Sequence, residues 1–380
     1  MEEQAKPTVL FFLSGLDVGG AERHTLDLRA RLMDRGWDVR LMVYGPRTSP
    51  AMRELPGAKD AVMLNLKGMS DMRGWGVVAR ALKAQNVDVV MGINQAPAIV
   101  TAILRLLGAT RAKVGCVFHT TLLRSEEERR LPLFKLAAHL MDVMAYVSRN
   151  QAAYWSGRGL RAKHTVTIPN GVDAARFSPA SDPLGAKAAL GFAASDVVIG
   201  MLAAFRPEKN HDQAVHALAA LRARGMPAKL LCVGDGPTRP DIEALATELG
   251  VKDHITFAGE QRDVSPFVAA FDVGLLPSLR VETFSLAALE SLASGVPMVM
   301  SNIGGASEIV EDGRNGFLFE AGDLSTLVDR LFIFNDLAAR KTIQALARPS
   351  IERYSIEAMV RAYERMLIDV AKDPARLQKE

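Results

Sequence analysis

Residues 272–302 read DVGLLPSLRVETFSLAALESLASGVPMVMSN, and this stretch decides the fold of the chain. DVGLLPSL is a short apolar run of strand length, SLAALESLASG has the pattern of a helix, and VPMVMSN is a second strand-like run. Gly295 follows the helical run, where glycine commonly ends a helix. Strand, helix and strand in this order predict parallel strands joined by a helical crossover.

The same alternation extends outward through the chain. Runs such as TVLFFLS, VDVVMGIN and AKVGCVFH alternate with helix-length segments in the first half, and the rhythm restarts at DVVIGMLAAF. The pattern predicts the α/β class, with two Rossmann-like domains facing across a cleft. Because prolines and small residues cluster at 170–195, we place an N-terminal domain at 1–175 and a C-terminal domain at 176–355.

The last segment, 356–380, contains one amphipathic helix. Two arrangements fit it: the helix packs back on the N-terminal domain, or it packs on the C-terminal domain that precedes it. In either case its apolar stripe is expected to be buried: Ile356, Met359, Val360, Tyr363, Met366, Leu367 and Val370.

Composition bounds the class of protein. The chain has 380 residues, 49% hydrophobic and 23% charged, as in a globular protein of two domains. Its acidic start and its strand-sized apolar runs predict a cytoplasmic protein with no signal peptide and no spanning helix. Cys116 and Cys232 each lie in a strand-like run, so we expect buried, reduced thiols and no disulfide or metal ligation.

Charge is unevenly shared along the chain. Residues 1–180 hold 25 Lys and Arg against 16 Asp and Glu, giving +9, and the remainder hold 21 against 27, giving −6. The basic half is expected to face an acidic partner, such as a phosphate-bearing lipid or a membrane surface. No basic run is interleaved with aromatic residues, so nucleic acid is not expected as a partner.

In parallel sheets ligands bind at the carboxyl ends of strands. Gly19 and Gly20 follow the first strand, where they allow an anion to approach the backbone, although a tight turn with nothing bound fits equally. His119 ends another strand and is expected to face the cleft, although a lone histidine is more often structural. Arg206 and Lys209 follow the strand DVVIGMLAAF, at a helix N-terminus, and this pair suits a diphosphate.

Two glutamates lie in the opening stretch among apolar residues. Glu282 precedes the helix and Glu290 lies within it, a separation of about 12 Å along a helix axis. The amides near Ser285 and Leu286 lie between them and can bind phosphate oxygens. Because a carboxylate without a counter-ion can accept hydrogen bonds from hydroxyl pairs, this arrangement predicts a site for a sugar nucleotide.

Three segments carry a resemblance to a known family: IPNGVDAARFSP, RPEKN and ETFSLAALESLASGVPMVMSNIGGASEIVEDGRNGFLF. Together they resemble the retaining glycosyltransferase family 4 group of the GT-B fold. The resemblance implies an acceptor-binding N-terminal domain and a C-terminal domain that binds a nucleotide sugar. It also implies transfer of a hexose-type sugar, from a UDP-sugar first and a GDP-sugar second, to a glycan or lipid-linked acceptor of the cell surface.

The resemblance also implies roles for residues. Glu282 contacts the donor sugar with help from His119, Glu290 holds the ribose, and Arg206 and Lys209 stabilise the diphosphate leaving group. Gly19 and Gly20 approach phosphate and acceptor, and SNIGGASE forms a turn beneath the donor. The catalytic set is therefore Arg206, Lys209, Glu282 and His119, and the binding set adds Gly19, Gly20, Phe284, Ser285, Leu286 and Glu290.

Two positions depart from the family pattern: Phe205 stands where glycine often precedes the arginine, and Ser285 stands where glycine often follows the phenylalanine. No Asp-x-Asp motif follows a strand, so no metal and no other cofactor is expected. Retention in this family is thought to involve front-face attack, so no protein nucleophile is assigned.

The acceptor is the least determined part. HTTLLRSEEERRLPLFKLAAHLMDVM mixes Arg124, Arg129, Arg130 and Lys135 with four apolar residues, Leu131, Leu133, Phe134 and Leu136. This mixture suits peripheral contact with the inner face of a membrane, or an ordinary solvated helix, and Glu126–Glu128 oppose anionic lipid. The rival functions that remain open are a non-catalytic nucleotide-sugar-binding module, an epimerase or a phosphorylase of the same fold, and a degenerate partner subunit.

Overall fold

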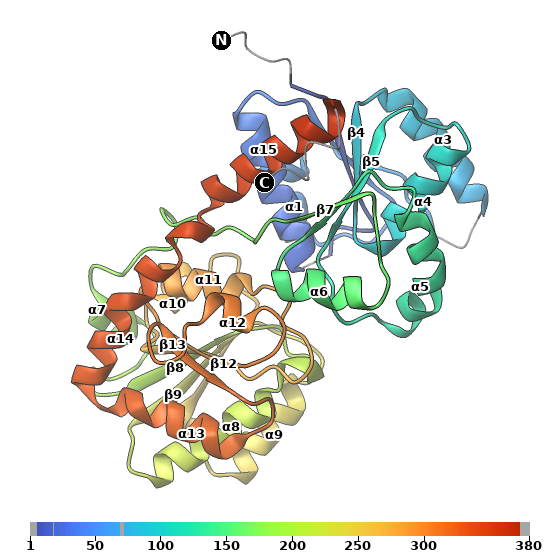
Figure 1. Cartoon of the computed structure of the whole chain (residues 1–380). Helices are drawn as coiled ribbons and strands as arrows, with labels where there is room; N and C mark the ends of the chain where they lie inside the picture. The colour runs from blue at the N-terminus through green and yellow to red at the C-terminus, as the bar shows by residue number, and fades with distance from the viewer. Residues whose placement is uncertain (1–5, 18, 69–71, 373–380) are drawn as a thin grey trace. The chain divides into compact units, whose positions relative to one another are not determined.

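The chain divides into two compact units in a computed structural model, which describes residues 6–17, 19–68 and 72–372. The N-terminal unit comprises Met1–Asn170 and Glu357–Glu380, and the C-terminal unit comprises Gly171–Ile356. Each unit is a parallel sheet with helices packed on it (Figure 1). The prediction of two Rossmann-like α/β domains is confirmed.

In the N-terminal unit the described strands form a seven-stranded parallel sheet of order β3-β2-β1-β4-β5-β6-β7. The chain proceeds from β1 toward β3 and then returns to β4 on the other side of β1. The topological switch point, where ligands bind in such sheets, therefore lies between β1 and β4. The strands are β1 Val9–Leu13, β2 Val39–Val43, β3 Val62–Met63, β4 Val89–Ile93, β5 Lys113–Phe118, β6 Val143–Tyr146 and β7 His164–Thr167.

Helices connect these strands as crossovers, as parallel strands require. Side chains from β1, β2 and β4 pack against α3 on one side, and side chains from β5 and β6 pack against α4, α5 and α6. The helices are α1 Gly20–Asp34, α2 Pro50–Arg53, η1 Pro56–Ala58, α3 Met72–Gln85, α4 Gln95–Leu106, α5 Ser125–Ala138 and α6 Arg149–Gly157.

In the C-terminal unit the described strands form a six-stranded parallel sheet of order β10-β9-β8-β11-β12-β13. β8 and β11 are neighbours at its centre, so the residues that follow them lie at one carboxyl edge. The strands are β8 Val197–Leu202, β9 Ala228–Val233, β10 Ile255–Gly259, β11 Val273–Leu276, β12 Met298–Ser301 and β13 Gly316–Phe319.

The opening stretch of the sequence forms β11, α11 and β12 of this sheet, and Gly295 ends α11 with φ +78°. The helices of the unit are α7 Pro183–Ala189, η2 Pro207–Lys209, α8 His211–Ala223, α9 Arg239–Glu248, η3 Lys252–His254, α10 Ser265–Val268, α11 Leu286–Ala293, α12 Ala306–Ile309, α13 Leu324–Phe332, η4 Ile333–Asn335, α14 Leu337–Ser350 and η5 Glu352–Tyr354.

Two strands, β7 and β13, were not predicted from the sequence. β7 is an edge strand of four residues, HTVT, whose side chains are alternately half-buried and exposed, so it lacks the apolar run that marks the other strands. β13 is equally short, GFLF, and directly follows three turn residues, 313–315. Short edge strands carry a weak apolar signal because only one side of them is covered.

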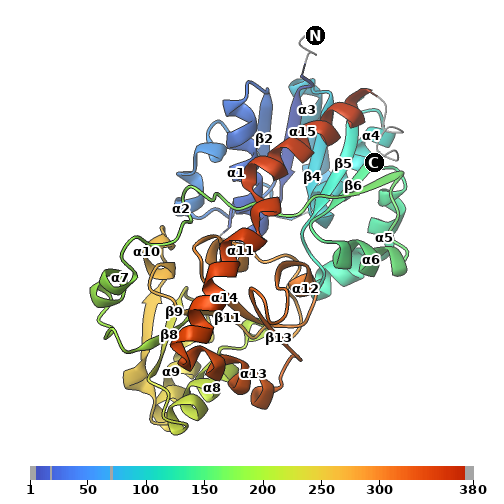
Figure 2. The same ribbon diagram turned by 60° about the vertical axis from the view of Figure 1, so that its left-hand side comes forward.

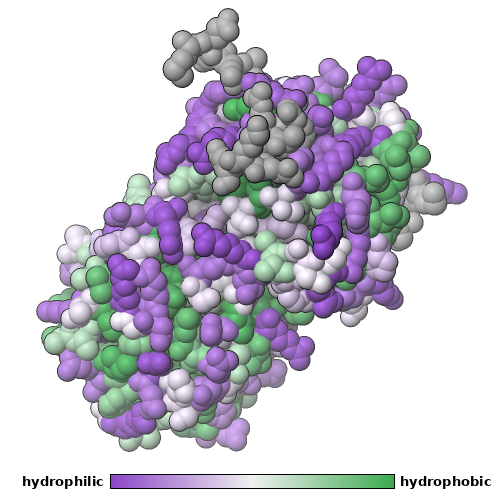
Figure 3. All heavy atoms as spheres, in the orientation of Figure 1, coloured by the Kyte–Doolittle hydropathy of each residue, from purple (hydrophilic) through white to green (hydrophobic). Residues whose placement is uncertain are grey.

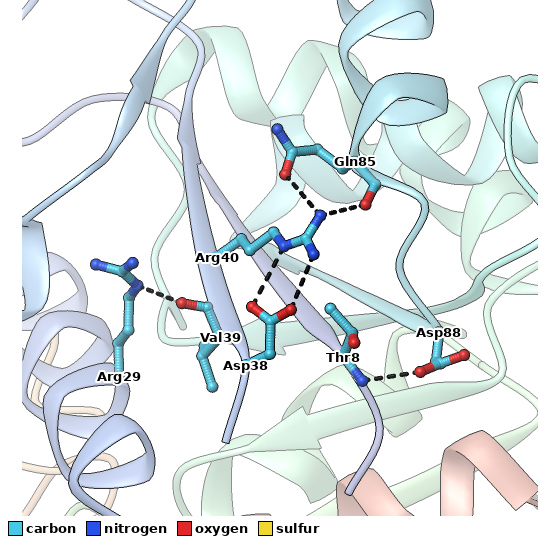
Figure 4. Close-up of polar contacts among 7 residues, drawn as sticks. All are labelled: Thr8, Arg29, Asp38, Val39, Arg40, Gln85 and Asp88. Atoms are coloured by element: carbon cyan, nitrogen blue, oxygen red, sulfur yellow. Dashed lines mark hydrogen bonds and ion pairs between the residues drawn. The ribbon is translucent and has the colours of Figure 1, made fainter. Parts of the chain in front are cut away.

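An Asp-Val pair opens several strands, and its carboxylate accepts a hydrogen bond from a neighbouring segment. Asp88 accepts from the Thr8 amide at 2.8 Å, just before β4 and β1 begin (Figure 4). The same view shows Arg40 donating to Asp38 and to the backbone and side chain of Gln85. These contacts satisfy backbone and side-chain groups at the amino edge of the sheet, which the strand ladder leaves unpaired.

Two of these aspartates are buried with cations. Asp142 accepts from the Val114 amide at 2.9 Å and pairs with Arg105 and Lys163. In the C-terminal unit, Asp272 accepts from the Val198 amide at 2.7 Å and pairs with Lys187 at 2.6 Å and Arg340 at 3.1 Å. Lys187 is 4% exposed and Asp272 is 7% exposed, so this second cluster is an ion triad with two buried members and a half-buried Arg340.

The C-terminal helix α15, Ile356–Lys372, completes the N-terminal unit. Both ribbon views draw it beside α1 (Figures 1 and 2). Tyr363 bonds His24 of α1 at 3.2 Å, and Glu364 accepts from Arg35 at 2.8 Å and from the Trp37 indole at 2.9 Å. The apolar stripe expected on this helix is buried.

Two further expectations concern membrane-spanning helices and the cysteine thiols. None of the helices in the described part of the chain combines the length and the apolar character needed to cross a membrane. Cys116 and Cys232 are free and buried, as predicted. Burial raises the pKa of the Cys116 thiol strongly and that of Cys232 to about 12, so both stay protonated and unreactive at neutral pH.

Candidate functional site

The segment after β8 presents the two predicted cations. Arg206 precedes the single turn η2, Pro207–Lys209, and α8 begins at His211. The Arg206 side chain is exposed and has no partner among residues 6–17, 19–68 and 72–372. An exposed guanidinium without a carboxylate, beside a helix N-terminus, is available for an anion.

Lys209 does have a partner. Its Nζ lies 2.7 Å from Glu282 Oε2, and the same oxygen accepts from Ser278 Oγ at 3.0 Å. A backbone bond from the Leu279 amide to the Glu208 carbonyl, 3.0 Å, joins the two loops. The expectation that Glu282 lacks a counter-ion is therefore wrong: Lys209, brought beside it by the pairing of β8 with β11, supplies one. Glu282 Oε1 makes no such bond within the described ranges and can accept from a ligand hydroxyl.

The N-terminus of α11 follows Glu282 directly. Ser285 caps this helix, its Oγ accepting from the Ala288 amide at 3.2 Å. The first two helical amides, of Leu286 and Ala287, have no carbonyl one turn earlier to bond within the helix, as at any helix start. They are donors for an anion at the same edge as Arg206 and Lys209.

The two remaining predicted residues of this unit are buried. Phe284 is 4% exposed and packs edge-to-face against Tyr354, with ring centroids 5.2 Å apart. It supports the loop from beneath. Glu290 lies within α11 and is 6% exposed, and Glu282 is 7% exposed, so neither is a solvated surface glutamate.

The glycine-rich turn after β12 packs on the backbone of Glu282. The Gly305 amide donates to the Glu282 carbonyl at 2.9 Å. A Cβ on Gly304, where φ is +57°, would come within 2.2 Å of that carbonyl oxygen. Glycine is therefore required at 304 both by its backbone conformation and by this close approach.

In the N-terminal unit, Gly19 and Gly20 begin α1 after β1. Gly19 has an extended backbone, φ −162°, so its conformation does not demand glycine. A Cβ on Gly20 would meet no atom within 4 Å, so the space beside it is open in the described structure. The pair leaves room for a ligand at this edge. The contacts with phosphate and acceptor that the resemblance implies for it stay predictions.

His119 follows β5 at the same edge of the N-terminal sheet, but its ring packs on protein. Its centroid lies 4.7 Å from that of His24, edge-to-face, and its Nε2 is enclosed without a hydrogen-bond partner in the described structure. Burial, with a smaller effect from His24, lowers the His119 pKa well below its usual value, so the ring is neutral. His119 as a whole is half-buried, and the expectation that it faces the cleft stays a prediction.

The predicted residues thus form two groups, one in each unit. Arg206, Lys209, Glu282 and the amides after Ser285 gather at the carboxyl edge of β8 and β11. Gly19, Gly20 and His119 lie at the carboxyl edge of β1 and β5.

Both groups fall within matched families. A model described as Glycosyl transferases group 1 matches residues 196–332, and one described as Glycosyltransferase Family 4 matches residues 18–176. The lipopolysaccharide core biosynthesis mannosyltransferase LpsB of Rhizobium meliloti is 30% identical over 262 residues, 66% of this chain and 71% of that protein. The chain belongs to glycosyltransferase family 4.

Several other relatives match less of their own length. N-acetyl-alpha-D-glucosaminyl L-malate synthase of Bacillus anthracis is 33% identical over 185 residues, which is 48% of each chain. Among solved structures, Anabaena HepE in complex with UDP-glucose superposes with a TM-score of 0.80 at 22% identity, covering 95% of this chain and 99% of that one. The likeness in structure confirms the predicted GT-B fold.

Several residues of the glycosyltransferase site were missed in the sequence. Ser278, which holds Glu282, has no distinctive neighbours, and Tyr354, which supports Phe284, lies 70 residues further along. Asn94 was also missed, although it ends a strand in the same way as His119. A polar residue within two positions of the end of a buried strand was the signal that could have found Ser278 and Asn94.

Only part of α5, the helix predicted to contact the acceptor, is exposed. Leu131 and Phe134 belong to the core, so they are wrongly placed in the proposed apolar face. Leu133, 41% exposed, and Leu136, 67% exposed, remain on the outside of α5. Leu106 and Leu107, at the end of the adjacent α4, are exposed as well.

Three buried histidines of the glycosyltransferase predict acid sensitivity. Burial lowers the pKa of His24 and His211 to about 4, and that of His119 well below the ordinary histidine value near 6.5. The unfolded chain therefore binds more protons than the folded chain between about pH 6.5 and 4. Stability should be fully present above pH 6.5 and should fall by about 1.4 kcal/mol per pH unit for each histidine as pH is lowered.

Urea unfolding between pH 7.5 and 5 measures this slope. His24→Gln should remove one histidine's share of it. A stability that is constant from pH 7.5 to 5 would contradict the buried, neutral state of these rings.

Proposed function

We propose that this protein is a retaining, metal-independent glycosyltransferase that moves a hexose-type sugar from a nucleoside-diphosphate sugar to a glycan or lipid-linked acceptor. One observation carries the proposal: the Lys209–Glu282 pair lies near Arg206, which has no partner among the described residues, and near the first amides of α11. Cations and amides suit a diphosphate, and a carboxylate suits sugar hydroxyls.

Departure of the nucleoside diphosphate places negative charge on the β-phosphate. Arg206, Lys209 and the α11 amides stabilise that charge as it develops, which is how fixed donors lower a barrier. The bond from the anomeric carbon to the phosphate oxygen breaks as the acceptor oxygen forms its bond on the same face. The departing phosphate takes the acceptor's proton, so no protein nucleophile is needed.

Two named neighbours support the choice of substrates. HepE has been crystallised with UDP-glucose, and the name of LpsB assigns it to lipopolysaccharide core synthesis. A UDP-sugar is therefore the first donor proposed and a GDP-sugar the second, with an acceptor in cell-surface polysaccharide or glycolipid synthesis.

A thermal-unfolding panel of UDP, GDP, ADP and their sugars tests donor binding. A ligand present at 100 times its Kd should stabilise the folded chain by about 2.7 kcal/mol. Glu290→Ala should abolish the shift caused by the preferred nucleotide, whereas Glu248→Ala, an exposed glutamate on α9, should leave it unchanged.

An unchanged shift in Glu290→Ala would contradict the assignment of Glu290 to the ribose. Binding without any release of nucleoside diphosphate, with glycan and lipid-linked acceptors supplied, would instead favour a non-catalytic binding module.

Contact with a membrane is part of the proposal. The exposed Leu133 and Leu136 lie near Arg129 on α5, and a leucine and a cation side by side suit a lipid surface. Apolar areas on the face drawn in Figure 3 are separate and interrupted by hydrophilic residues, which suits reversible contact. Co-sedimentation with anionic vesicles should occur and should fall in Leu133→Ser/Leu136→Ser. Equal sedimentation of the two proteins would contradict this surface.

A further inference from the structure

Tyr354 contacts two separate segments of the candidate site from one position in the chain. Its ring packs edge-to-face against Phe284, two residues after Glu282, with ring centroids 5.2 Å apart and an interplanar angle of 74°. Its hydroxyl donates a hydrogen bond of 2.7 Å to the Glu308 carbonyl of α12, just beyond the glycine-rich turn. One side chain therefore holds both the loop that carries Glu282 and the turn that packs on that loop.

The turn and the loop meet at the backbone of Glu282. The Gly305 amide donates to the Glu282 carbonyl at 2.9 Å, and the Glu308 amide donates to the Gly305 carbonyl at 3.0 Å. A shift of α12 would therefore move the Gly305 amide, and a shift of Phe284 would move the chain two residues from Glu282. Both contacts of Tyr354 thus determine where the Glu282 side chain is placed.

Tyr354 is itself held by its backbone, as a residue that supports a site has to be. Its amide donates to the Ile351 carbonyl at 2.8 Å, and its carbonyl accepts from the Val172 amide at 2.9 Å. The Ile356 amide donates in turn to the Val172 carbonyl at 2.9 Å, as part of a parallel bridge. The ring and the hydroxyl therefore extend from a fixed point of the C-terminal unit.

The carbonyl that Tyr354 binds needs a donor from outside its own helix. Glu308 lies in the last turn of α12, Ala306–Ile309, where carbonyls lack amides one turn later within the helix. The Tyr354 hydroxyl supplies such a donor at 2.7 Å, and Arg353 Nη2 supplies a longer bond of 3.3 Å to the same oxygen. Removal of the hydroxyl takes away the shorter of these two bonds and loosens α12.

We propose that Tyr354 is a positioning residue of the glycosyltransferase, which fixes the Glu282 carboxylate for the hydroxyl groups of the donor sugar. The inference rests on the proposed function in one respect, which is the role of Glu282 toward that sugar. The nucleotide part of the donor should depend much less on Tyr354. Arg206 follows a different strand, β8, and Glu290 lies within α11, which has its own cap at Ser285.

Tyr354→Phe removes the hydroxyl and keeps the ring. Affinity for UDP-glucose, measured by calorimetry, should fall about three- to tenfold, because a displaced Glu282 bonds the sugar less well. Affinity for UDP should stay at the wild-type value, and GDP-mannose with GDP forms a second pair of probes. Tyr354→Leu also loses the ring contact with Phe284 and should weaken UDP-glucose further, again without affecting UDP. A loss of stability alone would not separate the sugar from the nucleotide in this way.

Tyr44→Phe is the matched control. Tyr44 also donates its hydroxyl to a backbone carbonyl, that of Gly68 at 2.8 Å, and its ring lies 6.3 Å from that of Phe12. It belongs to the N-terminal unit, so this variant should keep the wild-type ratio of the two affinities. A wild-type ratio in both Tyr354 variants would overturn the proposal.

Hydrogen exchange of the Gly305 amide, followed by NMR, measures the placement of the turn without any ligand. This amide should exchange about threefold faster or more in Tyr354→Phe, because the bond to Glu282 opens more often. The reference is the Gly274 amide, which donates to the Pro297 carbonyl at 2.8 Å in the same unit. An unchanged ratio of the two exchange rates would also overturn the inference. Failure of the wild type to bind any nucleotide sugar would instead count against the proposed function, and Gly305 exchange would still decide whether Tyr354 holds the turn.

Discussion

Arg206→Ala should lower kcat by about 10²–10³-fold, the usual cost of removing one fixed donor from a developing oxyanion. The stability of the chain should hardly change, because the Arg206 side chain is exposed and pairs with no carboxylate in the described structure. Turnover measured as release of nucleoside diphosphate, together with thermal unfolding, separates these two effects.

The control is Arg224→Ala, which removes an exposed arginine at the C-terminal end of α8. Arg224 forms a surface ion pair with Asp329 at 2.8 Å, and such pairs contribute about 0–1 kcal/mol. This variant should turn over like the wild type. Full activity in Arg206→Ala would remove the leaving-group role from Arg206 and leave Lys209 and the α11 amides as the only donors proposed.

Asp272→Ala should destabilise the C-terminal unit by about 3–5 kcal/mol, because it leaves the buried Lys187 and the nearby Arg340 without their counter-ion. It also removes the acceptor of the Val198 amide. Chemical unfolding followed by a probe in the C-terminal unit measures the loss.

Asp272→Asn separates the loss of the negative charge from the loss of the hydrogen bond. Its amide oxygen still accepts from the Val198 amide but carries no charge. Lys187→Met combined with Asp272→Asn should recover part of the stability, because the buried ammonium is then gone as well. Asp329→Ala, on the surface, should cost less than about 1 kcal/mol. If Asp272→Ala were as mild as Asp329→Ala, the triad would not be buried in solution.

Most of the fold could be predicted from periodicity. Strands such as β1 and β4 are apolar runs that are buried on both faces, and the segments between them are long enough for crossover helices. The strands β7 and β13 could not be predicted, because four residues of mixed exposure or a short run after a turn carry little pattern. The residues at strand ends were predicted because parallel topology places them at one edge.

Contacts between site residues that are far apart in the chain could not be predicted from the sequence. Lys209 and Glu282 are 73 residues apart, so their contact depends on the neighbouring placement of β8 and β11. The contact of His24 with Tyr363 joins α1 to α15, which comes from the other end of the chain.

That last helix has a consequence for the order in which the protein forms during synthesis. His24 and Tyr363 are 339 residues apart, so at 5–20 residues per second the ribosome needs roughly 20 to 70 s to supply the partner of a histidine it made near the start. Residues 171–356 are contiguous and can fold as soon as they emerge. The unit whose translation begins first is therefore completed only after residues 171–356 have been made, with Trp37 and His24 lacking their partners until α15 leaves the exit tunnel.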